Sequence, residues 1–158
     1  MSPQATVAPV RRSVAVEAAP ERAFAVFTEG FGGWWPSTQS VVQGGWGTAV
    51  IEPREGGRWY ERGATGAECD WGRVLAYEPP HRLLVSWQLD AGYRIVADPA
   101  RASEIEVRFT PEGDGTRVDL EHRHFERHGE DGESVAESVG GDGGWSGLLT
   151  RYAEAAGA

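Results

Sequence analysis

The chain has 158 residues, of which 40% are hydrophobic and 25% are charged, and its formal net charge is −9 at pH 7. This composition is typical of a globular protein with a sizeable core. The acidic balance excludes nucleic acid and anionic membranes as principal partners, since both select clustered cations. All 15 basic residues are arginine, so reactions that need a lysine, such as those of Schiff-base or P-loop enzymes, are excluded.

The chain shows no sign of secretion or of a membrane span. Cys69 is the single cysteine, so no intrachain disulfide can form, and no apolar run approaches the length that crosses a bilayer. We therefore expect a cytoplasmic protein. Residues 1–9 are expected to be a disordered leader, and residues 10–158 a single domain.

The N-terminal part of this domain predicts one strand and one or two short helices. Weak alternation predicts the strand over residues 10–16. Pro20 is a favourable first helical residue, and the helix that follows it is expected to end near Gly30. A second short helix or turn over residues 31–36 is stopped by Pro36.

The middle of the chain predicts an antiparallel sheet. Runs with strand-like alternation are separated by turn-forming residues, and the expected strands cover residues 48–52, 57–62, 68–78, 81–89, 103–110 and 116–124. Residues 90–101 are expected to form a loop. Residues 125–144, rich in glycine, glutamate and serine, are expected to form a mobile linker.

The last strand and the terminal helix carry the clearest patterns. Apolar and charged residues alternate strictly over residues 116–122, so that Val118, Leu120 and His122 share one face. Asp142 is a good N-cap, and an apolar stripe at helical spacing follows it, formed by Trp145, Leu148, Leu149 and Tyr152. A half-buried strand followed by such a helix predicts that the helix packs across the sheet.

The element order predicts an α+β fold in which a curved antiparallel sheet wraps around a long C-terminal helix. Glycines within or beside the strands would help the sheet to bend. Strand parity then gives the side chains that should face the helix, namely Val74, Leu83, Val85, Trp87, Ile105, Val107, Phe109, Val118, Leu120 and His122.

Several short motifs occur in a characteristic order, among them Gly33-Trp34-Trp35-Pro36, Trp71-Gly72-Arg73-Val74, Pro79-Pro80-His81-Arg82-Leu83 and Gly144-Trp145. Together they resemble the family of homologues of the activator of the heat-shock chaperone ATPase. That family belongs to the START-like (SRPBCC) superfamily, which also holds polyketide cyclases and the birch-pollen allergen. The resemblance runs from about Val10 to the end. It implies a helix-grip fold around an apolar cavity, and the family name implies a chaperone link and a role in stress response.

A ligand in such a cavity would meet the tryptophans and the inward apolar side chains. Buried tryptophans are more often core fillers than ligand contacts, but several of them together give flat walls and indole N–H donors. The expected ligand-binding residues are Trp34, Trp35, Trp59, Val74, Val85, Trp87, Val107, Phe109, Leu120, His122, Trp145, Leu148, Leu149 and Tyr152.

The histidines raise the question of a metal site. His122 and His124 lie two apart on a predicted strand and therefore on one face, which is a metal-ligand geometry in β-proteins. A third converging ligand is needed, and nothing in the sequence fixes the direction of His128. We therefore expect no metal and no other cofactor. His122 is expected to be either a locally bonded polar group or a contact for a ligand headgroup.

No catalytic residue is assigned from the sequence. Cys69 lies between two acidic residues, which should raise the pKa of its thiol. Arg58 or Arg73, if turned inward, could bind a carboxylate or an enolate. Acid–base roles stay open for Glu55, Glu61 and Asp70.

We therefore expect a binding protein for a small hydrophobic or amphipathic molecule, held between the sheet and the C-terminal helix. A module that binds a chaperone or another protein is the first alternative. A cyclase, lyase or hydrolase acting on a cavity-bound substrate is the second. The chain is expected to be a monomer or a homodimer.

Overall fold

The computed structural model describes residues 7–36, 45–89 and 98–157. The first strand and helices are β1 (Val10–Val16), α1 (Pro20–Thr28) and α2 (Phe31–Trp34). The strands that follow are β2 (Trp46–Ile51), β3 (Arg58–Gly63), β4 (Glu68–Glu78), β5 (Arg82–Trp87), β6 (Ser103–Glu112) and β7 (Gly115–Arg123). The remaining elements are η2 (Pro99–Arg101), η3 (Phe125–Asp131), α3 (Gly132–Gly140), η4 (Asp142–Ser146) and α4 (Gly147–Ala156). None of the helices in the described ranges is long and apolar enough to cross a membrane.

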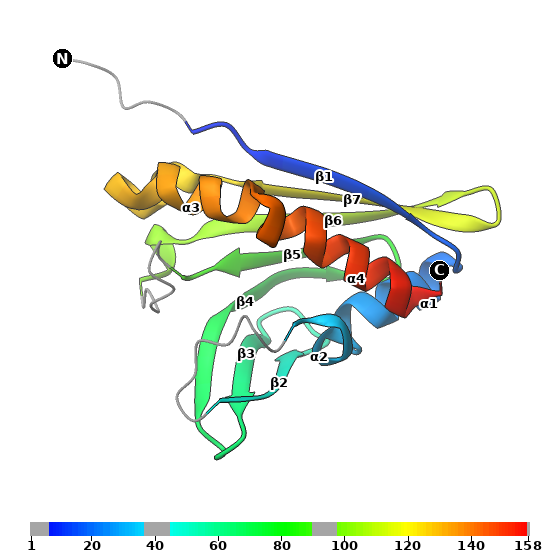
Figure 1. The fold of residues 1–158 in the computed structure, drawn as a ribbon, viewed down its shortest axis with the longest axis horizontal. Helices are drawn as coiled ribbons and strands as arrows, with labels where there is room; N and C mark the ends of the chain where they lie inside the picture. Colours follow the sequence, from blue (N-terminus) through cyan, green and yellow to red (C-terminus); the bar gives the residue numbers. More distant parts are fainter. Residues whose placement is uncertain (1–6, 37–44, 90–97, 158) are drawn as a thin grey trace.

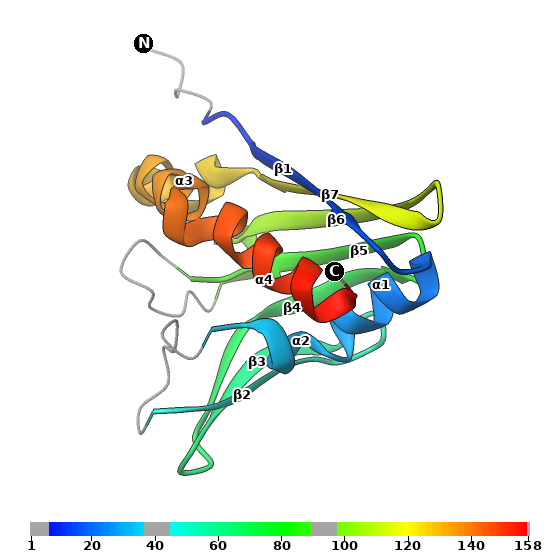
Figure 2. The same ribbon diagram turned by 45° about the vertical axis from the view of Figure 1, so that its right-hand side comes forward.

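The strands form one antiparallel sheet in the order β1-β7-β6-β5-β4-β3-β2. The register shifts in three of its strand pairs, β2–β3, β3–β4 and β4–β5, and such irregularities increase the local bend of a sheet. Figures 1 and 2 show the result: the sheet curls around α4, and α1 and α2 lie beside the C-terminal end of that helix. The predicted α+β helix-grip fold is confirmed.

The alternation predicted for the last strands places the core. In β7, Val118, Leu120 and His122 are each at most 2% exposed. They pair with Phe109, Val107 and Ile105 of β6, and all of them lie on the concave face of the sheet. Helix α4 covers this face with Leu148, Leu149 and Tyr152, which are also buried.

The segment predicted to be a mobile linker is instead ordered structure. Residues 125–144 contain η3, α3 and most of η4, and they bury Phe125, Val135 and Val139. Val135 and Val139 are one helical turn apart and make a short apolar stripe, which the surrounding glycine, glutamate and serine residues obscured. The prediction was wrong because burial against distant strands, and not local propensity, orders this segment.

Trp145 belongs to a π-helical turn that joins α3 to α4. The backbone at Gly144 is non-helical, with φ −95° and ψ −140°. A Cβ at this position would lie 2.0 Å from the carbonyl oxygen of Val139, so only glycine fits. The regular helix α4 therefore begins at Gly147, after the N-cap predicted at Asp142, and Trp145 lies in the turn ahead of it with its 2% exposed side chain in the core.

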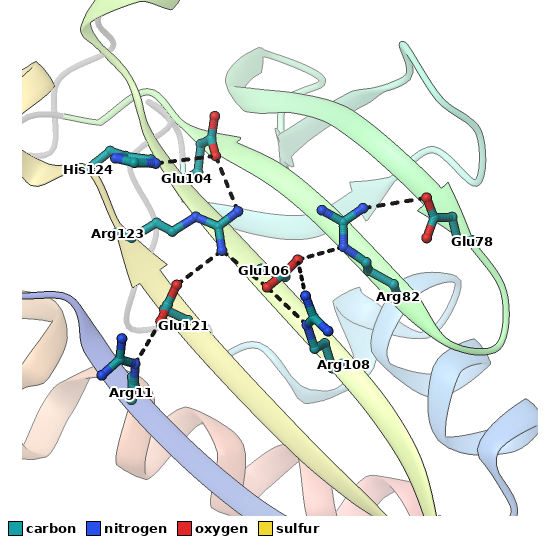
Figure 3. Close-up of polar contacts among 9 residues, drawn as sticks. All are labelled: Arg11, Glu78, Arg82, Glu104, Glu106, Arg108, Glu121, Arg123 and His124. Atoms are coloured by element: carbon teal, nitrogen blue, oxygen red, sulfur yellow. Dashed lines mark hydrogen bonds and ion pairs between the residues drawn. The ribbon is translucent and has the colours of Figure 1, made fainter.

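The convex face of the sheet carries a charged array (Figure 3). At its centre is Glu106, whose side chain is only 9% exposed and which bonds Arg82 at 2.6 Å, Arg108 at 3.1 Å and Arg123 at 3.1 Å. Burial raises the pKa of Glu106, but the three guanidinium hydrogen bonds outweigh it and hold that pKa at about 2. The acidic and basic side chains of this face therefore neutralise one another through charge-assisted hydrogen bonds.

Candidate ligand-binding site

Six of the seven tryptophans meet on the concave side of the sheet. Trp59, Trp71 and Trp87 come from β3, β4 and β5, Trp34 and Trp35 come from the end of α2 and the residue after it, and η4 supplies Trp145. Each of the six is at most 4% exposed. The rings form a continuous chain of contacts, with centroids 5.6 Å apart for Trp59 and Trp71, 5.7 Å for Trp59 and Trp87, and 6.2 Å for Trp87 and Trp145. We call this set the tryptophan cluster; its members are Trp34, Trp35, Trp59, Trp71, Trp87 and Trp145.

Trp71 was missing from the predicted site because strand parity failed in β4. With Val74 facing inward, strict alternation would place Trp71 on the convex face. The pairing between β3 and β4 instead shifts between Trp59 and Tyr60, so that β4 has an extra residue opposite β3. Both Trp71 and Val74 are consequently 1% exposed. The neighbouring Gly72 was the available signal, since a glycine inside a strand often marks a bulge.

The indole N–H groups of the cluster divide into partnered and unpartnered donors. Trp34 Nε1 donates to the carbonyl oxygen of Val26 at 3.1 Å, and Trp145 Nε1 donates to His122 Nδ1 at 3.1 Å. By contrast, the buried Nε1 atoms of Trp59, Trp71 and Trp87 find no acceptor in the described parts of the chain. An unpaired buried donor costs about 1–3 kcal/mol and is rare in folded proteins. Three such donors therefore lie in adjoining rings of the cluster, as far as the described residues show.

His122 lies at the edge of this cluster and is fully buried. Its ring centroid is 5.4 Å from that of Trp87 and 4.5 Å from that of Phe125. Burial, with a smaller contribution from the nearby His128, lowers the pKa of His122 well below 6.5, so the ring is neutral. Because an indole N–H can only donate, Nδ1 of His122 accepts the bond from Trp145, and its proton therefore resides on Nε2.

A short hydrogen-bond chain continues from His122. Its Nε2–H donates to Ser103 Oγ at 2.8 Å. Nε2 of His128 accepts the backbone N–H of Ser103 at 3.3 Å, so the Ser103 hydroxyl donates to the same nitrogen at 2.7 Å. Ser103 and His128 are themselves 0% and 3% exposed. The chain links β6, β7, η3 and η4, and it holds the Trp145 ring in place.

The predicted pairing of His122 with His124 on one face is wrong. The strand ends at Arg123, and His124 adopts the left-handed conformation with φ 65°, which turns its side chain away. Its imidazole is 42% exposed and approaches Glu104 and Glu126 on the outside. Within the described residues, no group of three histidine, cysteine or acidic side chains lies close enough together to hold a metal ion.

The other predicted residues belong to a second aromatic group beside α1. The ring centroid of Phe109 is 5.1 Å from that of Phe24 and 5.9 Å from that of Phe27, and the centroids of Tyr152 and Phe27 are 5.1 Å apart. The Tyr152 hydroxyl donates to the carbonyl oxygen of Ala23 at 2.6 Å, and burial raises its pKa. This group is joined to the tryptophan cluster through Trp34, whose ring is 5.5 Å from Tyr152. The remaining predicted residues are buried in the same hydrophobic core, namely Val74, Val85, Val107, Leu120, Leu148 and Leu149.

The arginines suggested as inward anion ligands point the other way. Arg58 pairs with Asp70 at 2.6 Å and with Glu68 at 3.1 Å, and it stacks over the Tyr60 ring at 4.0 Å. The side chain of Arg73 is 50% exposed. Both therefore belong to the convex face, where the curvature of the sheet gives charged side chains access to water.

Three hollows lined by described residues lie away from the cluster. One, of about 310 Å³, is on the convex face beside Arg108 and Asp119. Another, of about 270 Å³, lies between α1 and Tyr77, next to Phe24. The third, of about 190 Å³, lies beside Arg73 and Leu75. None of these three hollows is lined by a residue of the tryptophan cluster. That a ligand contacts the individual side chains expected from the sequence stays a prediction.

Comparison with known proteins identifies relatives along the whole chain. The model of the family "Activator of Hsp90 ATPase homolog 1-like protein" matches residues 17–157. Among solved structures, the anthrahydroquino-γ-pyrone synthase Txn09 is 40% identical with a TM-score of 0.66, and the match covers 95% of this chain and 97% of the synthase. CalC, a self-sacrificing resistance protein from Micromonospora echinospora, is 35% identical with a TM-score of 0.67, over 94% of this chain and 93% of CalC.

A more distant structure shows the same fold. Protein MLL2253 from Mesorhizobium loti is 19% identical with a TM-score of 0.67, and the match covers 94% of this chain and 96% of that protein. No curated protein matches the chain significantly. The match of the family model over nearly the whole chain agrees with the seven-stranded sheet gripping a C-terminal helix. The chain therefore belongs to the family of activator of Hsp90 ATPase homolog 1-like proteins.

Proposed function

We propose that this protein binds a flat aromatic small molecule that carries carbonyl or similar acceptor oxygens, at the tryptophan cluster between the sheet and α4. The observation that carries the proposal is the set of three buried indole N–H groups, on Trp59, Trp71 and Trp87, that have no acceptor among the described residues. The rings supply apolar surface for an aromatic frame, and the N–H groups supply donors for its oxygens. The name of the 40% identical synthase, which refers to an anthrahydroquinone and a pyrone, supports a ligand of this class.

The energetic argument favours oxygen-bearing ligands over plain hydrocarbons. Each indole donor that gains an acceptor contributes about 0.5–1.5 kcal/mol net, or roughly 2- to 12-fold in affinity. A hydrocarbon of the same shape would bury the same apolar area but leave the donors unpaired. The cluster should therefore discriminate between molecules of equal size by the presence of acceptor oxygens.

Anthraquinone and anthracene provide the test, because they share a three-ring frame and differ in the two carbonyl oxygens. Titration of the protein with each, followed by tryptophan fluorescence and calorimetry, should give saturable binding of anthraquinone with a Kd on the order of micromolar. Anthracene should bind several-fold more weakly. In each of the variants Trp59→Phe, Trp71→Phe and Trp87→Phe, this preference should shrink.

The matched control is Trp34→Phe, since that indole N–H is already bonded to Val26 and is not available to a ligand. This variant should leave the ratio of the two affinities unchanged. If anthraquinone shows no saturable binding, or if the ratio is the same in the wild type and all four variants, the proposal is wrong.

A ring-forming reaction is the second candidate function. The observation in its favour is the synthase Txn09, which is 40% identical over nearly the full length of both chains. His122 would not serve directly as its base in this arrangement, because both ring nitrogens are engaged, with Trp145 and with Ser103. Incubation with hydroxylated aromatic polyketide precursors, followed by mass spectrometry of the products, separates a catalyst from a binding protein.

A chaperone partner has less support. Docking on another protein usually needs an exposed apolar patch, and the described residues expose only one large hydrophobic side chain, Leu75, at 39%. We retain a cytoplasmic location as an expectation, since a lone cysteine suits a reducing compartment. Analytical ultracentrifugation would decide between the expected monomer and homodimer.

A further inference from the structure

A carboxylate lies on the same face of the sheet as the unpartnered indoles. Glu61 of β3 is 0% exposed, and it follows Trp59 by two residues along a stretch of β3 that pairs in regular register with β2. It pairs with Ala49 of β2 and with Cys69 of β4. Residues two apart on a strand share a face and are separated by about 7 Å, so the Glu61 side chain starts beside the tryptophan cluster.

The neighbours of Glu61 on β3 confirm that it faces inward. Arg58, Tyr60 and Arg62 occupy the opposite face, where both guanidinium groups lie over the Tyr60 ring, at 4.0 and 5.7 Å from its centroid. Arg62 also pairs with Glu68 at 2.9 Å. On the inward side, burial raises the pKa of the Cys69 thiol, and the charge of Glu61 adds to this effect.

A buried carboxylate on an apolar face is expensive and needs hydrogen bonds. Removing such a group from water costs several kcal/mol unless donors compensate it. Glu61 has interactions of its own within the protein. A carboxylate offers about four acceptor positions, however, so it can keep these interactions and still accept a bond from a ligand.

We infer that Glu61 is a specificity-determining residue, which accepts a hydrogen bond from a hydroxyl group of the ligand while Trp59, Trp71 and Trp87 donate to its carbonyl oxygens. The inference rests on the proposed function and deepens it. The tryptophan cluster provides donors only, and Glu61 provides an acceptor, so the two sets are complementary to an aromatic frame that carries both kinds of group. The preferred ligands are therefore hydroxyquinones and hydroxylated aromatic ketones.

The experiment compares anthraquinone with 2-hydroxyanthraquinone, whose hydroxyl is too far from the carbonyl oxygens to bond them internally. Binding is measured by calorimetry at a pH below the pKa of the probe. The wild type should bind the hydroxylated probe about 10-fold more tightly, as expected for a hydrogen bond to a charged acceptor. In Glu61→Gln, which keeps the shape and one acceptor oxygen but removes the charge, the preference should fall to about 2-fold or less, as for a neutral hydrogen bond.

Glu106→Gln is the matched control, because Glu106 is a nearly buried carboxylate on the convex face. It should keep the wild-type preference. A second measurement needs no variant: the wild type should bind 2-methoxyanthraquinone no more tightly than anthraquinone, since the methyl group removes the hydroxyl donor. This keeps the inference testable if Glu61→Gln does not fold.

The inference is overturned if Glu61→Gln retains the 10-fold preference, if it loses affinity equally for both probes, or if the methoxy probe binds like the hydroxy probe. In those cases anthraquinone still binds and only the role of Glu61 fails. If neither probe binds the wild type, the proposed function itself fails, and the inference fails with it.

Discussion

The hydrogen-bond partners of the indole N–H groups predict opposite effects on stability for substitutions at two tryptophans of the same cluster. Trp87 and Trp145 are 4% and 2% exposed, and their rings are in contact. Trp145 donates to His122, whereas the Trp87 donor is unpartnered in the described structure. Substitution by phenylalanine removes one ring and one donor in each case, and the loss of packing costs about 1 kcal/mol at either site.

Apart from packing, the change in hydrogen bonding shifts the free energy of unfolding in opposite directions at the two positions. In Trp145→Phe, the buried Nδ1 of His122 loses its donor, which costs about 1–3 kcal/mol more, so the total destabilisation is about 2–4 kcal/mol. In Trp87→Phe, a buried donor that was unsatisfied disappears, and the relief of about 1–3 kcal/mol offsets the packing loss. The second variant should therefore be as stable as the wild type or slightly more stable.

Urea unfolding followed by far-ultraviolet circular dichroism measures the difference without relying on tryptophan emission. The midpoint should drop clearly for Trp145→Phe and stay near the wild-type value for Trp87→Phe, with unchanged m-values. If Trp87→Phe is destabilised as much as Trp145→Phe, the Trp87 donor is paired in solution. The argument for an external acceptor at that ring would then fail.

Three further predictions follow from the buried polar groups and the helix break. Because the unfolded chain takes up a proton at His122 below 6.5 and the folded chain does not, stability should fall by up to about 2 kcal/mol between pH 7 and 5 in urea titrations, and a His122→Gln variant should lack most of this slope. Glu106, with its pKa held at about 2, stabilises the fold above its ordinary value of 4.5, so this contribution should be lost as the pH falls from 4.5 towards 2, and Glu106→Gln should show a shallower acid transition. Gly144→Ala should cost about 2 kcal/mol or more of unfolding free energy, because its Cβ would collide with Val139; thermal melting within a degree of the wild type would contradict the steric argument.

Local sequence patterns correctly predicted burial where the apolar residues recur with the period of a regular strand or helix. The alternation in β7 correctly placed Val118 and Leu120 on the concave face, and the apolar spacing after Trp145 correctly placed Leu149 against the sheet. These residues sit in uninterrupted elements, where each position fixes the direction of the next. Cys69 was also anticipated to have a raised thiol pKa, although burial contributes more to it than the acidic neighbours do.

The same reasoning failed wherever the period was broken. Trp71 was left out of the inward face because strand parity does not anticipate the irregularity in the pairing of β4. His124 was misplaced by one residue in the left-handed conformation, which put His128 and not His124 near His122. The direction of Arg58 could not be read from the sequence either, since it depends on the position of Asp70 across the sheet.

The sequence alone determined the class of fold and the inward faces of its regular strands, because both follow from periodicity, which is a local property. Only the tertiary structure decided which polar groups are paired. The bond from Trp145 to His122, the lack of an acceptor for Trp59 and Trp87 among residues 7–36, 45–89 and 98–157, and the burial of Glu61 all depend on distances between residues far apart in the chain or on how the sheet curves over them. Hydrogen bonding needs atoms placed within a few tenths of an ångström, and no pattern of residue types along the chain specifies positions that finely.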